Sequence, residues 1–417
     1  MNLPEGFIEM MRGLLGEEAD AFLEAMQRPP VTSVRLNSRK PSCAFPLDSE
    51  GVSPVKWCPT GRYLKQRPVF TLDPLLHAGA YYVQDASSMI HYEVIRRILK
   101  ELTHESETPL KVLDMCAAPG GKTTAMIDAL PDGSRVIANE YVGKRAGILR
   151  ENLIKWGYPL AMVTNRDSAW FAQSGDSFDV VAVDAPCSGE GMMRKDEDAV
   201  KQWSPELIAQ CASLQREILT NAVKALRPGG FLVYSTCTFN REEDEENARF
   251  IHEELGLTPF DLKFPEDWGI PGGIDTDLPV YRFMPHKTEG EGLFLAVFRM
   301  PGEFEPSLTD SVLKEKDKRS KPTRPAKPIK NGKKPADDVP EIEEILSVDF
   351  DRSSHPVVDV SRDQALAYLR RESITLPPET PKGIVIVAYG GLPLGPAKNI
   401  GSRANNLYPK NWRILMR

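Results

Sequence analysis

The sequence predicts an α/β fold built on a mostly parallel sheet, with a small α+β module before it and a second small domain after it. Two observations predict the sheet. Short apolar segments alternate with segments of helical periodicity between residues 110 and 236, as expected when crossover helices join parallel strands. Glycine-rich or cysteine-containing turns follow several apolar segments, at the strand ends where open parallel sheets bind ligands.

The first 105 residues are expected to form the α+β module. Apolar residues at helical spacing predict a helix over residues 3–28, which a pair of prolines ends. Residues 31–37 alternate as a strand does, and residues 38–80 are rich in proline and turn signals. These changes of character predict a domain that covers residues 1–105.

The central domain is predicted to cover residues 106–300. Its five expected strands are residues 111–114, 134–139, 161–164, 178–183 and 231–236. Helices are expected between them, which requires helices on both faces of the sheet. A further apolar stretch, residues 291–299, is expected to add a late strand at an edge of the sheet.

The last part of the chain is expected to be a linker followed by a globular domain. Residues 301–340 form the predicted linker, because the segment from Lys314 to Lys334 holds ten Lys or Arg, two acidic residues and several prolines. Residues 341–417 regain globular character, with a helix near 361–372 and a strand near 383–389. The linker could bind nucleic acid or act only as a solvated tether.

Composition restricts the class of protein. The chain has 417 residues, of which 41% are apolar, and no stretch of about 18 apolar residues that would span a membrane. It begins without a secretory signal pattern, so we expect a cytoplasmic protein. The six cysteines form no C-x-x-C pair, so neither a metal site nor a disulfide framework is expected.

A glycine-rich turn with the sequence Asp-Met-Cys-Ala-Ala-Pro-Gly-Gly-Lys-Thr lies between the first central strand and its helix, at residues 114–123. Such a turn lets a ligand approach the backbone and the free N–H groups that begin the helix. A nucleoside triphosphate loop is disfavoured because its spacing requires glycine at position 116, which is Cys. Glu140 ends the second strand, where a carboxylate can bind a ribose, although a solvated glutamate is the alternative. Asp167 follows the third strand.

Two cysteines lie at neighbouring strand ends. Asp184-Ala-Pro-Cys187-Ser-Gly follows the fourth strand, and Ser-Thr-Cys237-Thr follows the fifth. A single cysteine in such a core is usually a small buried apolar residue. Two at the same edge, one of them beside an aspartate, favour catalytic chemistry. The acidic run 242–246 is interpreted as ordinary charge at the start of a helix.

These three blocks resemble motifs I, IV and VI of the Sun/Fmu-type (NSUN) RNA 5-methylcytosine methyltransferases, and residues 82–88 resemble that family's upstream motif. The resemblance covers residues 80–300 closely. The C-terminal part is similar to the bacterial RsmF 16S rRNA methyltransferase branch, whose extension includes a PUA-like RNA-binding region. The resemblance implies a Rossmann-like class I methyltransferase that uses S-adenosyl-L-methionine to methylate carbon 5 of cytosine.

The resemblance also implies a role for each motif residue. Cys237 is the implied nucleophile, Cys187 is implied to assist product release, and Asp184 is implied to hydrogen-bond the cytosine. Glu140 departs from the aspartate frequent in the family, but its longer side chain can still accept both ribose hydroxyls. The residues implied to bind the cofactor are Cys116, Ala117, Ala118, Pro119, Gly120, Gly121, Lys122, Glu140, Asp167 and Asp184.

The expected partner is RNA, either 16S rRNA or the small ribosomal subunit, bound by a monomer without metal or membrane. The net charge of −7 is segregated, because residues 1–300 carry 32 basic against 43 acidic side chains, whereas residues 301–417 carry 20 against 16. Arg35, Arg39 and Lys40 are expected to add to the RNA surface.

Three alternatives to this function stay open. Transfer RNA is an alternative substrate for the same reaction. A DNA cytosine methyltransferase would use the Pro-Cys cysteine as its nucleophile instead. A non-catalytic RNA-binding assembly factor would retain the fold but fail to bind S-adenosylmethionine.

Overall fold

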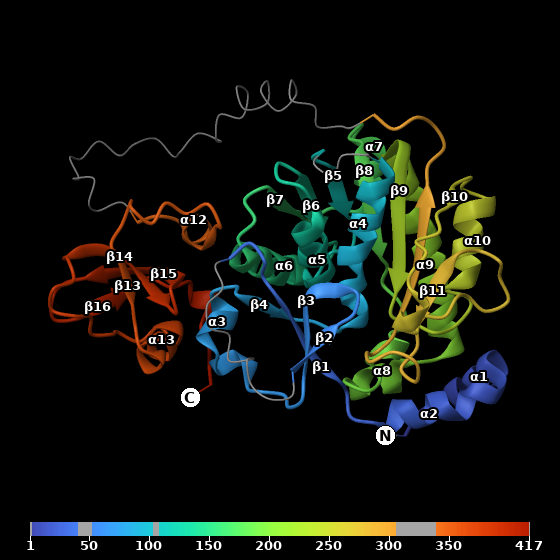
Figure 1. Cartoon of the computed structure of the whole chain (residues 1–417), viewed down its shortest axis with the longest axis horizontal. Coiled ribbons are helices and arrows are strands. Elements are labelled where there is room, and N and C mark those ends of the chain that lie inside the picture. The colour runs from blue at the N-terminus through green and yellow to red at the C-terminus, as the bar shows by residue number, and fades with distance from the viewer. Residues whose placement is uncertain (1, 41–51, 103–107, 306–338, 417) are drawn as a thin grey trace.

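The computed structural model describes every residue except 1, 41–51, 103–107, 306–338 and 417. Three sheets follow one another across the molecule, with the C-terminal domain beside the N-terminal module in Figure 1. Most of the predicted linker lies outside the described residues. Among the residues described, the longest apolar helices fall short of what a membrane crossing needs. The predicted domain boundaries at 105, 300 and 340 stay predictions.

Within the described residues, the central sheet has eight strands. Five of them, β9, β8, β5, β6 and β7, are neighbours that pair in parallel. In spatial order the strands are β10 (Thr258–Pro259), β12 (Leu293–Arg299), β9 (Leu226–Thr236), β8 (Phe178–Asp184), β5 (Lys111–Asp114), β6 (Arg135–Asn139) and β7 (Ala161–Thr164), with β11 (Val280–Phe283) also paired to β12. The five predicted strands are confirmed.

The late strand is not at an edge, contrary to the prediction. Strand β12 pairs antiparallel with β9 on one side and with β10 and β11 on the other. All but its last residue are buried. Its uniformly apolar sequence, Leu-Phe-Leu-Ala-Val-Phe, suits a strand covered on both faces better than an edge strand.

Helices cover both faces of the central sheet, as the alternation predicted. Alternate residues of each strand face opposite sides, so Val112 and Val180 join one apolar core while Leu113 and Val181 join the other. The first core packs against α4 (Ile90–Leu102), α5 (Gly121–Ala129) and α6 (Gly143–Trp156). The second packs against α7 (Ser168–Gln173), α9 (Pro205–Ala225) and α10 (Glu245–Glu253).

The N-terminal module consists of a helical pair and a small sheet. The predicted helix is interrupted by a short 3-10 turn, giving α1 (Glu5–Leu15) and α2 (Ala19–Gln27), which pack against Trp203 and Phe239 beside α8 (Glu197–Gln202). The sheet has the order β2 (Val52–Val55), β3 (Cys58–Leu64), β1 (Thr32–Leu36) and β4 (Tyr81–Val83), and α3 (Pro74–His77) precedes β4.

The predicted RNA surface near β1 is wrong for Arg35, which is buried. Arg39 and Lys40 are half-buried and bonded within the protein, and Lys40 donates to the Lys155 carbonyl at 2.7 Å. Arg35 is fully buried, pairs with Asp128 and donates from Nε to Gln84 Oε1 at 2.8 Å. Arg39 pairs with Asp132 and donates to the Leu130 carbonyl at 2.8 Å. Both arginines attach the module to the helices of the central domain, because their partners lie on or beside α5.

The C-terminal domain has a four-stranded sheet with two helices beside it. The strands are β13 (Val357–Asp359), β14 (Gly383–Tyr389), β15 (Leu392–Asn399) and β16 (Ala404–Asn406), and the helices are α12 (Ile342–Leu346) and α13 (Arg362–Leu369). The predicted helix and strand are confirmed. Val34 and Tyr81 of the N-terminal sheet join the apolar core of this domain, so the two small sheets share one core.

We expect Arg35→Ala to destabilise the protein by about 3–5 kcal/mol, because it leaves the Asp128 carboxylate buried without its counter-charge. Urea unfolding at pH 7 measures the change. Arg39→Ala serves as the control and should cost about 1 kcal/mol or less, since its partner Asp132 is exposed. Equal losses for the two variants would contradict this account.

Candidate active site

The predicted cofactor turn lies at the carboxyl end of β5. Residues 115–120 form the turn, and α5 begins at Gly121. Gly120 has a φ of 109°, and a Cβ atom there would lie 3.2 Å from Leu149 Cδ1. Glycine is therefore required by both the backbone conformation and the close packing of α6. The predicted residues Cys116 to Lys122 all lie in this turn or at the start of α5.

Glu140 and Asp167 occupy different environments. Glu140 is 4% exposed at the end of β6, accepts a hydrogen bond from the Val142 amide at 2.8 Å and lies 3.3 Å from an Arg145 nitrogen. The alternative of a solvated glutamate is therefore excluded. Asp167 is exposed and caps α7 by accepting from the Ala169 amide at 2.8 Å. Its contact with a ligand stays a prediction.

The two cysteine loops meet because β8 and β9 are neighbouring parallel strands. Asp184, the last residue of β8, is in register with Ser235 near the end of β9. The loops that follow bring Cys187 Sγ to 3.2 Å from Cys237 Sγ. Both cysteines are free and partly exposed. The sequence predicted this shared edge, but the direct contact between the sulfurs required the structure.

Asp184 lies between the glycine-rich turn and the cysteines. Its Oδ1 atom is ion-paired with the Lys122 ammonium and accepts a hydrogen bond from Ser235 Oγ at 2.9 Å. His91 lies behind Ser235, with its Nε2 atom 3.3 Å from the hydroxyl oxygen. Burial and the Lys122 charge lower the pKa of His91 to about 4, so this histidine is neutral at pH 7. Lys122 therefore connects the glycine-rich turn with Asp184, at the edge of the sheet where the two cysteines lie.

A buried glutamate connects the loop after β8, which contains Cys187 (the Pro-Cys loop), with the loop after β9, which contains Cys237 (the Thr-Cys loop). Glu190 accepts hydrogen bonds from the Phe239 amide at 2.6 Å and the Asn240 amide at 3.1 Å. It also accepts from the Trp203 indole at 3.0 Å. The main chain adds a bond from the Gly191 amide to the Cys237 carbonyl at 2.7 Å. The positions of the two loops therefore depend on each other.

The acidic run 242–246 is not ordinary charge at the start of a helix, so that interpretation is wrong. Glu243, Asp244 and Glu245 are each 0% exposed. Asp244 accepts from the Thr236 hydroxyl at 2.6 Å, and Glu245 is paired with the buried guanidinium of Arg282. The only signal in the sequence was the position of the run, five residues after Cys237, because composition does not reveal which acids are buried.

Asp114 is a further site residue that the sequence did not identify as functional. It is 1% exposed beneath the glycine-rich turn, and its Oδ2 atom accepts from the Thr123 hydroxyl at 2.6 Å. Burial and the nearby Asp184 charge raise the pKa of this carboxyl to about 7, against the lowering effect of Thr123 and Lys122. The turn therefore rests on a group that titrates near neutral pH.

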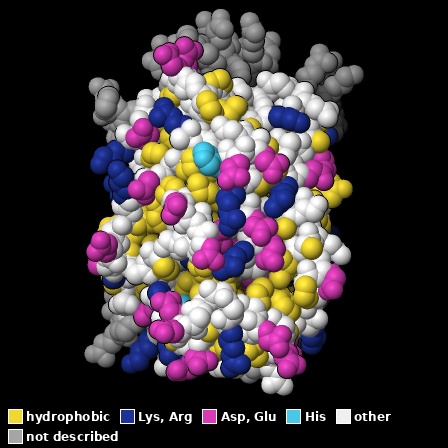
Figure 2. Space-filling model, turned by 90° about the vertical axis from the view of Figure 1, so that its right-hand side faces the viewer, with side chains coloured by type: hydrophobic (Ala, Val, Ile, Leu, Met, Phe, Trp, Pro, Cys, Tyr) yellow, Lys and Arg dark blue, Asp and Glu magenta, His cyan; other side chains and the backbone are white. Residues whose placement is uncertain are grey.

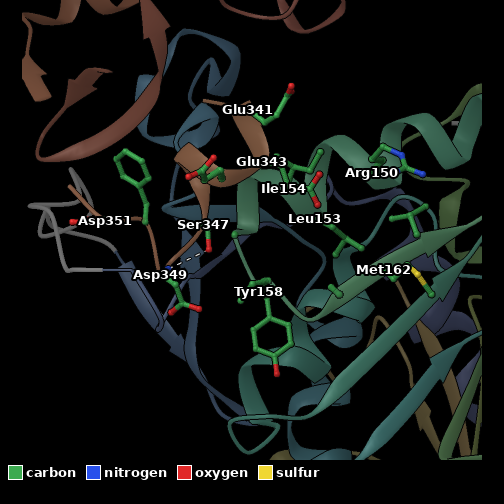
Figure 3. Close-up of a pocket in the computed structure, with 16 residues that line it drawn as sticks. Arg150, Leu153, Ile154, Tyr158, Met162, Glu341, Glu343, Ser347, Asp349 and Asp351 are labelled. Carbon is green, nitrogen blue, oxygen red and sulfur yellow. Dashed lines mark hydrogen bonds between the residues drawn. The ribbon is translucent and has the colours of Figure 1, made fainter. Parts of the chain in front are cut away.

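A large hollow of about 620 Å³ lies away from this site, between β7 with α6 and residues 341–351. Figure 3 shows Tyr158 and Met162 on one side of it and Glu341 and Glu343 on the other. Its acidic lining residues are Glu341, Glu343, Glu344, Asp349 and Asp351. This concentration of negative charge repels phosphate groups, so the hollow is unsuited to a nucleic-acid backbone.

The fold and this edge of the sheet define the class of protein as a methyltransferase of the Rossmann type. A methyltransferase homologue from Pyrococcus horikoshii is 27% identical, with a TM-score of 0.59 over 71% of this chain and 95% of that one. The structure titled NSun6 from Pyrococcus horikoshii with SFG, 23% identical with a TM-score of 0.59 over 71% of this chain and 98% of that one, shares the fold.

Three family models match consecutive parts of the chain. They describe the N-terminal domain of 16S rRNA methyltransferase RsmF (residues 3–86), 16S rRNA methyltransferase RsmB/F (residues 99–299) and the methyltransferase RsmF PUA domain (residues 355–414). These matches confirm the resemblance to the RsmB/F family that the motifs predicted. The predicted fold class and the cofactor, S-adenosylmethionine, are confirmed with it.

Two of the curated relatives share one name. Ribosomal RNA small subunit methyltransferase F from Cronobacter sakazakii is 35% identical over 73% of this chain and 64% of its own length. The protein of that name from Escherichia coli O6:H1 is 35% identical over 71% of this chain and 63% of its own length. The chain thus spans slightly under two thirds of the length of these relatives.

We expect Asp114→Asn to change how stability depends on pH. The folded-state pKa of about 7 lies above the unfolded value of about 4, so folding favours the protonated acid. The stabilising contribution is complete below about pH 4 and is lost as the pH rises through about 7. The variant, which mimics the protonated acid, should gain stability relative to the parent between pH 4 and 8. Chemical unfolding across that range measures it, and parallel curves would contradict it.

Proposed function

We propose that this protein is an S-adenosylmethionine-dependent RNA (cytosine-C5)-methyltransferase that acts on 16S rRNA through a covalent cysteine–cytosine adduct. The observation that carries the proposal is the contact of two sulfurs, 3.2 Å apart, beside an aspartate and at the same sheet edge as the glycine-rich turn. The names of the relatives and of the three matching domains support small-subunit rRNA as the substrate.

The residues at the turn fit S-adenosylmethionine. The turn places the amides that begin α5 at the carboxyl end of β5, where a ligand can reach them. The buried carboxylate of Glu140 suits the ribose hydroxyls because it has acceptor capacity beyond its bond from the Val142 amide. Asp167 is the candidate for the adenine contact. The cofactor supplies the methyl group for transfer.

Carbon 5 of cytosine is a poor nucleophile, so the protein must first activate the ring. The thiolate of Cys237 forms a bond to carbon 6, and the carbon 5–carbon 6 π pair moves into the ring. Nitrogen 3, where this negative charge collects, takes a proton from solvent, and the Asp184 carboxylate accepts a hydrogen bond from the resulting N–H. Lys122 is ion-paired with this carboxylate and offsets its negative charge.

The adduct then resolves with all atoms accounted for. Carbon 5 would take the methyl group, which would leave the cofactor as a neutral thioether, and would next lose its proton to a base. The electron pair of that carbon–hydrogen bond re-forms the double bond and expels the Cys237 sulfur, while the proton on nitrogen 3 returns to solvent. Cys187 assists the departure of the sulfur, because its thiol contacts Cys237.

The target cytosine must leave its stack to reach this edge, which costs a few kcal/mol and favours single-stranded or loop RNA. The exposed cations of the C-terminal domain suit phosphate contacts and are Lys382, Lys398, Arg403, Lys410 and Arg413. The face shown in Figure 2 instead mixes acidic and basic side chains without one dominant sign. In this proposal the protein is a cytoplasmic monomer that needs no metal.

We expect the two cysteines to give opposite results when RNA containing 5-azacytidine is used to trap the adduct. Cys237→Ala should abolish the covalent complex on a denaturing gel, whereas Cys187→Ala should retain it, since Cys187 acts after addition. Both variants should still bind S-adenosylmethionine by calorimetry. Loss of the adduct in Cys187→Ala alone would favour the DNA-type mechanism, and failure of the parent protein to bind the cofactor would favour an assembly factor.

We expect one 5-methylcytosine in 16S rRNA to disappear when the gene is deleted, because the family and the C-terminal domain point to the small subunit. Bisulfite sequencing of total RNA from the deletion strain measures this. Return of the mark on expression of the parent protein, but not of Cys237→Ala, is the control. A mark lost from transfer RNA with 16S rRNA unchanged would replace the proposed substrate.

A further inference from the structure

The carboxylate of Glu243 bridges the two cysteine loops at a point next to Cys187. It accepts from the Ser188 amide at 3.1 Å and from the Ser188 hydroxyl. It also accepts from the Asn240 side-chain amide at 2.9 Å and from Gln215 Nε2 at 2.6 Å. Ser188 directly follows Cys187 and Asn240 lies three residues after Cys237, so one side chain joins both loops to α9.

The hydrogen bonds of Glu243 favour its ionised form. The Ser188, Asn240 and Gln215 nitrogens can only donate, so a proton on the carboxylate would displace one of their hydrogen bonds. Burial raises the pKa of Glu243 overall, and these hydrogen bonds oppose that rise. A carboxylate that accepts several charge-assisted hydrogen bonds is a fixed negative charge beside the sulfur of Cys187.

The two sulfurs are placed differently relative to the negative charge of Glu243. Sulfurs 3.2 Å apart can share one proton, and Glu243 is attached beside Cys187 through Ser188. The contact with Cys237, burial and the Glu243 charge raise the pKa of the Cys187 thiol well above its ordinary value. The Lys122 ammonium attracts both sulfurs, Cys237 more strongly than Cys187, so its charge acts in the same direction as that of Glu243. The ionisable groups around the pair, among the described residues, are Lys122, Asp184, Glu190, Cys211, Tyr234 and Glu243.

We propose that Glu243 is a positioning residue that keeps the shared proton on Cys187, so that Cys237 is the thiolate and Cys187 the thiol. This rests on the proposed function. During addition, Cys187 stays protonated and does not compete for carbon 6. During release, its S–H meets the sulfur expelled from carbon 6, and no oxidant or further reactant is needed.

The test compares the alkylation rates of the two cysteines in the full-length protein. Iodoacetamide is applied between pH 6 and 9, and mass spectrometry measures Cys187 and Cys237 separately. At pH 7 the parent protein should react faster at Cys237. In Glu243→Gln, the rate at Cys187 relative to Cys237 should rise about tenfold, as expected for a change of about one unit in the pKa difference.

Two control variants separate charge from packing. Ser188→Ala removes one hydrogen bond but keeps the charge, and Glu190→Gln neutralises the other buried carboxylate that joins the loops without bonding beside Cys187. Both should leave the relative rate at Cys187 within about twofold of the parent, where tenfold is one pKa unit. Thermal unfolding checks that each variant folds. An unchanged ratio in Glu243→Gln, or an equal change in Glu190→Gln, would overturn the inference.

Catalysis gives an independent readout. With RNA that contains ordinary cytosine, Glu243→Gln should lower kcat and KM together and should accumulate the covalent complex on a denaturing gel, because release is slowed more than addition. Equal losses at both steps would indicate a general structural defect and overturn the inference. If the parent protein forms no adduct, the proposed function fails, but the alkylation ratio still tests the placement of the proton.

Discussion

The contact between the two cysteine loops depends on two buried carboxylates that would be unfavourable anywhere else in the core. A buried carboxylate is tolerated only when hydrogen bonds replace its water. Glu190, which follows Cys187, accepts such bonds from Phe239 and Asn240, whereas Glu243 accepts them from Ser188 and Asn240 and so from both loops. These bonds form only when the loops lie together. The cost of burying the charges therefore penalises any arrangement that separates the sulfurs, which makes the site rigid where the chemistry needs it.

Charge is distributed around this contact in matched pairs. Lys122 pairs with Asp184 at the cofactor side, and Arg282 pairs with Asp244 and Glu245 below the Thr-Cys loop. The first pair joins the glycine-rich turn to the end of β8, and the second lies beyond the end of β9. Removing one partner from either pair would leave a buried charge uncompensated, which is more costly than the pair is stabilising. The active site is thus sensitive to substitutions that do not contact any ligand.

The N-terminal module and the C-terminal domain differ in how their cationic side chains are used. The N-terminal module uses its cations for attachment, because Arg35 and Arg39 are bonded to the central domain rather than exposed to RNA. The C-terminal domain presents exposed cations and shares an apolar core with the N-terminal sheet through Val34 and Tyr81. An acidic hollow separates part of this domain from β7. Contacts to an RNA backbone are therefore expected on the cationic surface and not across the hollow.

The sequence by itself determined how strands and helices alternate along the chain, where the glycine-rich turn lies and that both cysteines lie at one edge of the sheet. These features follow from local periodicity and from the rule that parallel strands end on the same side. Only the tertiary structure decided that Arg35 is buried, that β12 lies inside the sheet and that Glu243 and Asp244 support the cysteine loops. The sequence shows which residues are polar, but whether a polar side chain is buried depends on hydrogen-bond and ion-pair partners that distant segments supply.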